Sequence, residues 1–166
     1  MTMLDTLRSS QIFEGFREEH IEKISVLCRV GSHREGTLIT KEGDEAKEFY
    51  ILTGGLVTVE MQVQPVPGHP AIPTAVEVVE KGGSFGWSAL VEPYKYTFSV
   101  RCMTNCTVLA LRSDLLRKLM ADDIELGFEL MKRVACLVSL RLLHTRLRLV
   151  NGLGLIMLGK EIKTSE

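Results

Sequence analysis

The chain has 166 residues, which favours a single domain, since domains usually hold about 100–200 residues. Its 20 Lys and Arg against 21 Asp and Glu give a formal net charge of -1, which argues against a surface built to coat phosphate backbones. The hydrophobic fraction of 45% excludes global disorder, and four cysteines are too few for a disulfide scaffold. With no apolar run of membrane-spanning or signal-peptide type, we expect one soluble, cytoplasmic domain.

The first part of the chain carries apolar side chains at helical spacing over residues 4–29, interrupted near Gly15, and predicts two short helices. Short apolar runs separated by glycine-containing turns follow and predict strands. The clearest is 56–63, in which every second residue is apolar. The remaining runs are 37–40, 49–52, 76–79, 98–101 and 107–111. Such a series indicates an antiparallel sandwich or barrel.

Residues 62–75 hold four of the five prolines. Because proline cannot serve a central strand, this stretch is interpreted as a long hairpin loop with polyproline character. It is either a rigid connection or a flap that docks a partner, and the sequence does not decide between them.

From Ser113 onward the pattern becomes helical. Ser113 and Asp114 are expected to cap a short helix over 115–120, and the Asp122-Asp123 pair a second helix from 124 to about 150, roughly 40 Å long. This long helix carries several apolar stripes, more than one β domain can cover, so a second copy of the chain is the expected partner. The predicted dimer seam has heptad spacing and consists of Met131, Ala135, Val138, Leu142, Thr145 and Leu149.

At this point the residues resemble the cyclic-nucleotide-binding domain of the catabolite activator and of kinase regulatory subunits. The resemblance rests on Gly36, the turn Glu42-Gly43-Asp44, the run 49–52, and Gly55 followed by alternating valines. It implies an α+β fold: an antiparallel, jelly-roll-like β-roll flanked by N-terminal helices and a long C-terminal helix. We therefore expect a sensor domain over 1–150 and a tail over 151–166.

A second segment resembles the phosphate-binding cassette of that family, in which a short helix presents backbone N–H groups to the cyclic phosphate. In the family a Glu binds the ribose hydroxyl and an Arg neutralises the phosphate; here Trp87 stands at the Glu position and Tyr96 at the Arg position. The cassette positions that the resemblance marks as ligand-binding are Phe85, Gly86, Trp87, Ser88, Ala89, Tyr96, Thr97 and Phe98.

These departures predict that cyclic AMP and cyclic GMP do not bind in the usual way, because losing a charge-assisted contact costs about 1.5–3 kcal/mol. Three interpretations remain open. The aromatic side chains fill the pocket and leave a scaffold; or the pocket accepts a nucleotide-like or aromatic small molecule; or a residue outside the cassette restores cyclic-nucleotide binding. Arg141, near the helix position that faces the purine in relatives, is the candidate for that last role, and a solvent or salt-bridge arginine is its alternative.

Other functions find little support in the sequence. The four histidines are isolated, so no metal site is predicted, and Cys102 and Cys106 would lie about 13 Å apart on one strand unless a turn intervenes. No catalytic motif is evident, and residues 151–166 are too few for a DNA-reading module, so we expect neither an enzyme nor direct DNA binding. The predicted function is a stand-alone regulatory, ligand-sensing domain that signals to a protein partner. A ligand-free dimeric scaffold is the alternative.

Overall fold

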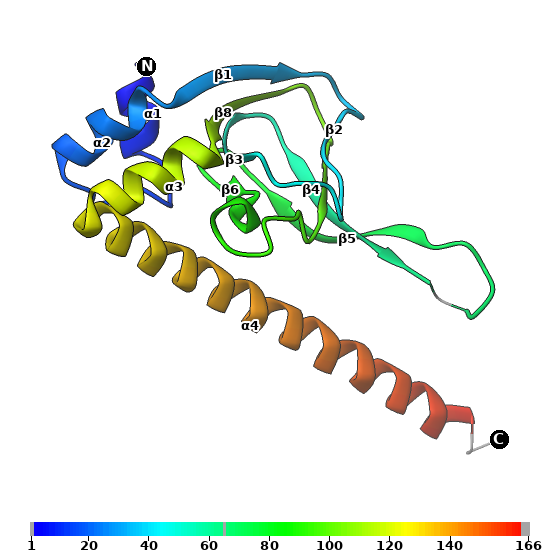
Figure 1. The fold of residues 1–166 in the computed structure, drawn as a ribbon. Coiled ribbons are helices and arrows are strands. Elements are labelled where there is room, and N and C mark those ends of the chain that lie inside the picture. Colours follow the sequence, from blue (N-terminus) through cyan, green and yellow to red (C-terminus); the bar gives the residue numbers. More distant parts are fainter. Residues whose placement is uncertain (1, 65, 164–166) are drawn as a thin grey trace.

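The structure, a computed structural model, describes residues 2–64 and 66–163, with side chains placed up to Asn151 except at 148 and 149. Eight strands form two four-stranded antiparallel sheets, ordered β1-β8-β3-β6 and β2-β7-β4-β5 (Figure 1). The strands are β1 (Cys28–His33), β2 (Leu38–Thr40), β3 (Glu48–Gly54), β4 (Val57–Val63), β5 (Ile72–Val79), β6 (Ser84–Phe85), β7 (Ser99–Cys102) and β8 (Cys106–Arg112). The predicted α+β class with an antiparallel β-roll is thereby confirmed.

The proline-rich segment is shorter as a loop than the sequence predicted. β4 and β5 pair as far as Val63 opposite Ile72, so the hairpin connection spans 64–71 rather than 62–75. Pro73 stands within β5, opposite Gln62. A proline is tolerated there because β5 is the last strand of its sheet and has a free edge. The β4–β5 hairpin extends away from the body of the domain (Figure 1).

Two short helices precede the β-roll, as predicted: α1 (Met3–Arg8) and α2 (Glu18–Ser25). Gly15 lies between them with a φ of 80°, a left-handed conformation that glycine adopts without strain. The predicted helical stretch was too long at its end, because β1 begins at Cys28. That strand pairs with β8 along its whole length.

Two helices follow the β-roll: α3 (Ser113–Asp122) and α4 (Ile124–Lys163). The predicted cap of α3 is wrong, since Arg112 holds the cap position and Ser113 Oγ instead donates to the carbonyl of Ala46 at 3.1 Å. Asp123 does cap α4, its Oδ1 accepting from the backbone N–H of Leu126 at 3.1 Å. α4 then continues through the predicted end at Val150 to Lys163.

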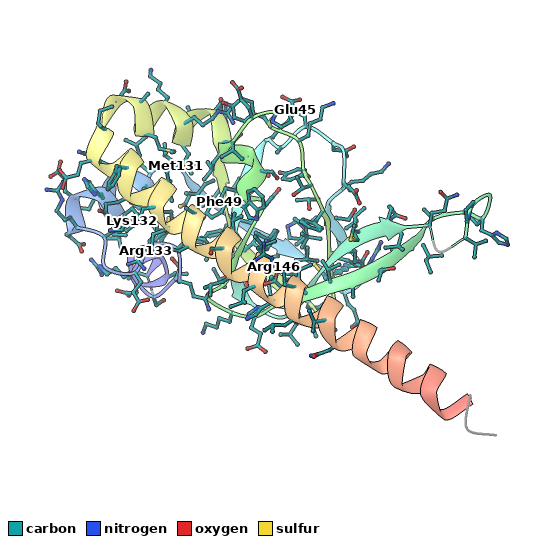
Figure 2. All side chains as sticks on the ribbon, turned by 90° about the horizontal axis from the view of Figure 1, so that it is seen from below. Glu45, Phe49, Met131, Lys132, Arg133 and Arg146 are labelled. Atoms are coloured by element: carbon teal, nitrogen blue, oxygen red, sulfur yellow. The ribbon has the colours of Figure 1, made fainter. Side chains whose placement is uncertain are left out.

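Helix α4 lies along the domain and extends past it, as Figures 1 and 2 show from two directions. Its first half presents Leu126, Leu130 and Val134 to the protein interior, where all three are buried. They join a core that also includes residues of α1, α2, α3 and the β1-β8-β3 sheet. A second core fills the space between the two sheets. The seating of α4 on the first core places its middle turns beside the cassette.

Candidate functional site

The cassette begins where β6 ends and a short helix, η1 (Trp87–Leu90), starts. Phe85 pairs with Tyr50 across the β3–β6 ladder, and the two rings stack at 5.0 Å between centroids. Gly86 then turns the chain with a φ of 77°. A Cβ there would lie 3.1 Å from the carbonyl oxygen of Glu48, so both conformation and space call for glycine.

Tyr96 is buried at the centre of this site, with 8% of its surface exposed. Its hydroxyl donates to the carbonyl oxygen of Glu48 at 2.9 Å and accepts from the Glu48 backbone N–H at 3.2 Å. Its own backbone is tied to the turn before β3, through bonds to Gly43 and Asp44. Burial raises the pKa of the Tyr96 hydroxyl, so it stays neutral at physiological pH.

A second tyrosine supports the first. The Tyr50 hydroxyl donates to the carboxylate of Glu48 at 2.7 Å, and Arg29 forms an ion pair with the same carboxylate at 2.5 Å. Burial, together with the bond to Glu48, raises the pKa of Tyr50. Glu48 therefore anchors both tyrosines, one through its side chain and one through its backbone. Sequence reasoning missed this residue, since a role carried partly by backbone atoms leaves no side-chain pattern to read.

The predicted cassette residues converge on one small cavity, called here the cassette cavity. Its volume is about 10 Å³, which is at the lower limit for holding a single water molecule, about 10–15 Å³. Of the nine predicted ligand-binding residues, the exception is Ala89, which lies in the core between the sheets. The eight that line the cavity are Phe85, Gly86, Trp87, Ser88, Tyr96, Thr97, Phe98 and Arg141. The structure thus brings eight of the nine predicted residues together, and their role in binding a ligand stays a prediction.

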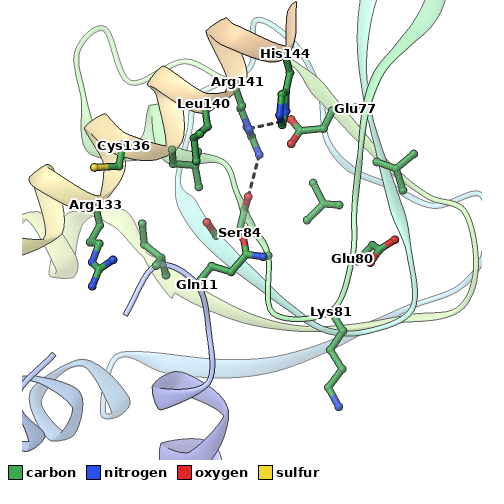
Figure 3. A pocket seen from close by; sticks show the side chains of 15 residues that line it. Gln11, Glu77, Glu80, Lys81, Ser84, Arg133, Cys136, Leu140, Arg141 and His144 are labelled. Atoms are coloured by element: carbon green, nitrogen blue, oxygen red, sulfur yellow. Dashed lines mark hydrogen bonds and ion pairs between the residues drawn. The ribbon is translucent and has the colours of Figure 1, made fainter. Parts of the chain in front are cut away.

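Arg141 connects α4 to this site. Its Nε lies 2.9 Å from a carboxylate oxygen of Glu77 in β5, and one terminal nitrogen donates to the carbonyl of Ser84 in β6 at 3.0 Å (Figure 3). Only 16% of its side chain is exposed. Burial lowers the pKa of the guanidinium, which the Glu77 carboxylate opposes. A salt bridge is one of the two roles that the sequence suggests for Arg141. The sequence does not indicate that Glu77 is the partner.

Similarity to known protein families identifies the family of this chain. The profile described as "Cyclic nucleotide-binding domain" matches residues 30–123, more than half of the chain. The chain belongs to the cyclic nucleotide-binding domain family. That assignment agrees with the observed β-roll and with the position of the cassette.

Relatives of this cyclic-nucleotide-binding domain occur in larger signalling proteins. The human cGMP-dependent protein kinase 2 is 33% identical over 85 residues, which cover 51% of this chain and 11% of the kinase. The cAMP-dependent protein kinase regulatory subunit of Dictyostelium discoideum is 28% identical over 121 residues, 72% of this chain and 36% of that protein. The chain therefore spans a minor part of the length of these relatives.

Solved structures include proteins of similar size. A putative cyclic nucleotide-binding protein from Geobacter metallireducens superposes with a TM-score of 0.74 at 28% identity, covering 86% of this chain and 99% of that one. The catabolite activator protein of Thermus thermophilus gives a TM-score of 0.68 at 19% identity, covering 84% of this chain and 62% of that one. At 19% identity, the similarity to the catabolite activator protein shows a shared fold.

The predicted dimer seam is only partly exposed. Val138 is half-buried against the helical core and Met131 is also half-buried, while Ala135, Leu142 and Thr145 face outward. Leu149 lies outside the described side chains. Large apolar side chains are also exposed on other faces of α4, namely Ile124, Phe128, Leu140, Leu143, Leu147 and Val150.

Metal and membrane sites find no support in the described part of the chain. No group of three His, Cys, Asp or Glu side chains there could hold a metal ion. Within the same residues, no helix is both long and apolar enough to span a bilayer. Cys102 and Cys106 lie on successive strands, β7 and β8, joined by a short turn, and both are buried.

Proposed function

We propose that this member of the cyclic nucleotide-binding domain family is a regulatory domain that does not take cyclic AMP or cyclic GMP in the usual way. The observation that carries the proposal is the small volume of the cassette cavity, about 10 Å³, with the buried ring of Tyr96 in its wall. Sites for drug-sized ligands enclose roughly 300–1,000 Å³. Admitting a nucleotide would require Tyr96 to leave both of its bonds to Glu48.

The charge at the cavity supports the same conclusion. A cyclic phosphate is an anion, and burying it requires a cationic or strongly hydrogen-bonding partner. Among the described residues that line the cavity, Arg141 is the one cation, and Glu77 already neutralises it. This weakens the idea that Arg141 restores cyclic-nucleotide binding.

The self-filled cavity favours the alternative raised by the sequence, a ligand-free scaffold, over an aromatic ligand in the cassette. Trp87, Phe98 and Tyr96 already surround the space such a ligand would need. In this proposal the domain holds its β-roll and α4 in one arrangement without a ligand, and a partner protein reads that arrangement.

Isothermal titration of the purified chain with cyclic AMP and with cyclic GMP tests the proposal. We expect no saturable heat at millimolar nucleotide. The variant Tyr96→Arg combined with Trp87→Glu carries the residues of the family's cassette pattern and serves as the comparison: binding gained by it would show that these two positions block the site. Micromolar binding by the unaltered chain would overturn the proposal.

We further propose that the domain is a homodimer through α4. The exposed apolar side chains on this helix support it, because contiguous apolar surface of this kind marks interaction sites. Two faces compete: the predicted seam, represented by Leu142, and the neighbouring stripe, represented by Leu143. They are 52% and 50% exposed, respectively.

Light scattering of Leu142→Glu and Leu143→Glu separates these faces. We expect Leu142→Glu to give monomers, whereas Leu143→Glu stays dimeric. The reverse result would move the interface to the neighbouring stripe, and a monomeric unaltered chain at micromolar concentration would refute the dimer.

A further inference from the structure

We propose that a second, open cavity of this domain binds a small amphipathic anion, with a carboxylate or sulfonate head group and a short apolar body. This cavity, called here the helix groove, lies between α4 and the turn that joins β5 to β6 (Figure 3). Its volume of about 450 Å³ falls in the range of small-molecule sites, roughly 300–1,000 Å³. It shares Arg141 alone with the cassette cavity.

One side of the groove is apolar. Ile12 lines it and is buried, while Leu137 and Leu140 come from successive turns of α4. Leu140 is 58% exposed and Val78, on the β5 side, 47%. Covering apolar side chains that are left open inside a concave site favours binding, because their surface is removed from water.

The charged residues that line the groove favour an anionic head group on the ligand. Lys81, Arg133 and Arg141 line the groove against two carboxylates, Glu77 and Glu80, so its formal charge is positive. Arg141 and Glu77 pair with each other, and Arg133 donates one bond to the carbonyl of Glu14. Within the described part of the chain, the Lys81 side chain has no hydrogen-bond or ion-pair partner.

Polar uncharged groups complete the site. The amide of Gln11 and the imidazole of His144 stand at opposite sides of the groove (Figure 3). Both can donate to an oxyanion. An apolar side with hydrogen-bond donors and a net positive lining matches an amphipathic anion better than a neutral or cationic ligand.

The position of the groove gives its occupancy a structural consequence. A ligand here touches α4 on one side and the β5–β6 turn on the other, the same elements that Arg141 ties together. Binding would therefore hold α4 against the β-roll, without passing through the closed cassette cavity.

The test uses anilinonaphthalene sulfonate, a fluorescent amphipathic anion, titrated into the purified full chain. We expect saturable binding with one probe per chain. The exposed neighbours Lys81 and Glu80 offer a matched pair of charge reversals. Lys81→Glu should weaken the affinity about fivefold, and Glu80→Lys should strengthen it by a similar factor. Equal affinities in both variants would refute the proposal.

A second pair fixes the location of the probe. Leu140 lines the groove, whereas Leu147 lies further along α4, does not line it, and is exposed to a similar degree, 52%. Leu140→Asp should abolish binding, and Leu147→Asp should leave it unchanged. If both lose the probe equally, it coats the apolar helix surface and the groove is not a site. None of these four positions lines the cassette cavity, so the result is independent of cyclic-nucleotide binding.

Discussion

The hydroxyl of Tyr96 is bonded twice to the backbone of Glu48, donating to its carbonyl oxygen at 2.9 Å and accepting from its N–H at 3.2 Å. The bonds place a neutral ring and hydroxyl where the family's cassette pattern has an arginine. The Tyr96 side chain is thus held against β3 by two hydrogen bonds as well as by the packing of its ring.

Removing the Tyr96 hydroxyl tests how much its two hydrogen bonds to Glu48 stabilise the domain. Tyr96→Phe keeps the ring and loses both bonds, and we expect the free energy of unfolding to fall by about 1–2 kcal/mol in urea denaturation. Tyr94→Phe is the control, because the Tyr94 ring packs under Arg117 and its hydroxyl has no partner among the described residues. A change within about 0.5 kcal/mol is expected there. Equal effects in the two variants would contradict the role assigned to the Tyr96 hydroxyl.

Two glycines with the same backbone conformation test the crowding at the cassette. Gly86 has a φ of 77° and Gly36 a φ of 78°. A Cβ added at Gly86 would lie 3.1 Å from the carbonyl oxygen of Glu48. A Cβ added at Gly36 would have no heavy atom of the described residues within 4 Å, apart from those of its chain neighbours. Gly36→Ala should cost about 1 kcal/mol, the price of the left-handed conformation.

Gly86→Ala should cost about 2–3 kcal/mol, because crowding adds to the same conformational penalty. Chemical denaturation of both variants gives the difference. If the two costs agree within error, the turn at Gly86 tolerates a side chain, and the close approach of η1 to β3 is not a constraint.

The fold was predictable because several strands are short apolar runs and turns with glycines separate some of them. β4 shows this most clearly, since its valines Val57 and Val59 are buried. β1 was missed because Arg29, Ser32 and His33 leave it without a clean apolar alternation, and its burial follows none. β6 has only two residues, too few to carry a period.

The site was predictable in composition but not in its bonding. Motif spacing identified Trp87, Tyr96 and Phe98 as replacements at cassette positions, and the structure gathers them around one cavity. The spacing could not show that Tyr96 bonds to backbone atoms of Glu48. Nor could it pair Arg141 with Glu77, since the two lie on elements that meet only when α4 packs beside β5.

The attachment of α4 to the β-roll through Arg141 is testable by hydrogen exchange. Arg141→Ala removes the ion pair to Glu77 and the bond to the Ser84 carbonyl. Beyond Val134, the last buried residue of α4 among the side chains that the structure describes, we expect faster amide exchange, with a loss of stability of about 1–2 kcal/mol. Arg146→Ala is the control, because Arg146 is exposed and has no partner in the described part of the chain. Unchanged exchange in Arg141→Ala would mean that apolar packing alone holds the helix.

The buried thiols predict how stability depends on alkaline pH. Burial raises the pKa of Cys28 from an ordinary 9.0 to about 12, and burial together with the neighbouring Cys106 thiol raises the pKa of Cys102 to about 12. Above pH 9.0 the unfolded chain loses these protons while the folded chain keeps them, so the folded state binds more protons and its stability falls as pH rises. The fall should reach at most about 1.4 kcal/mol per pH unit for each thiol, until the folded thiols also ionise near pH 12.

Two cysteine variants isolate this effect from lysine and tyrosine ionisation, which also occurs in this range. Cys28→Ala removes the thiol whose pKa is raised by burial alone, and the slope of unfolding free energy against pH should become shallower by the contribution of one proton. Cys136 is exposed, so Cys136→Ala should leave the slope unchanged. Urea unfolding at several pH values above neutrality provides the measurement. Parallel slopes in the two variants would show that Cys28 ionises in the folded protein as easily as in the unfolded chain.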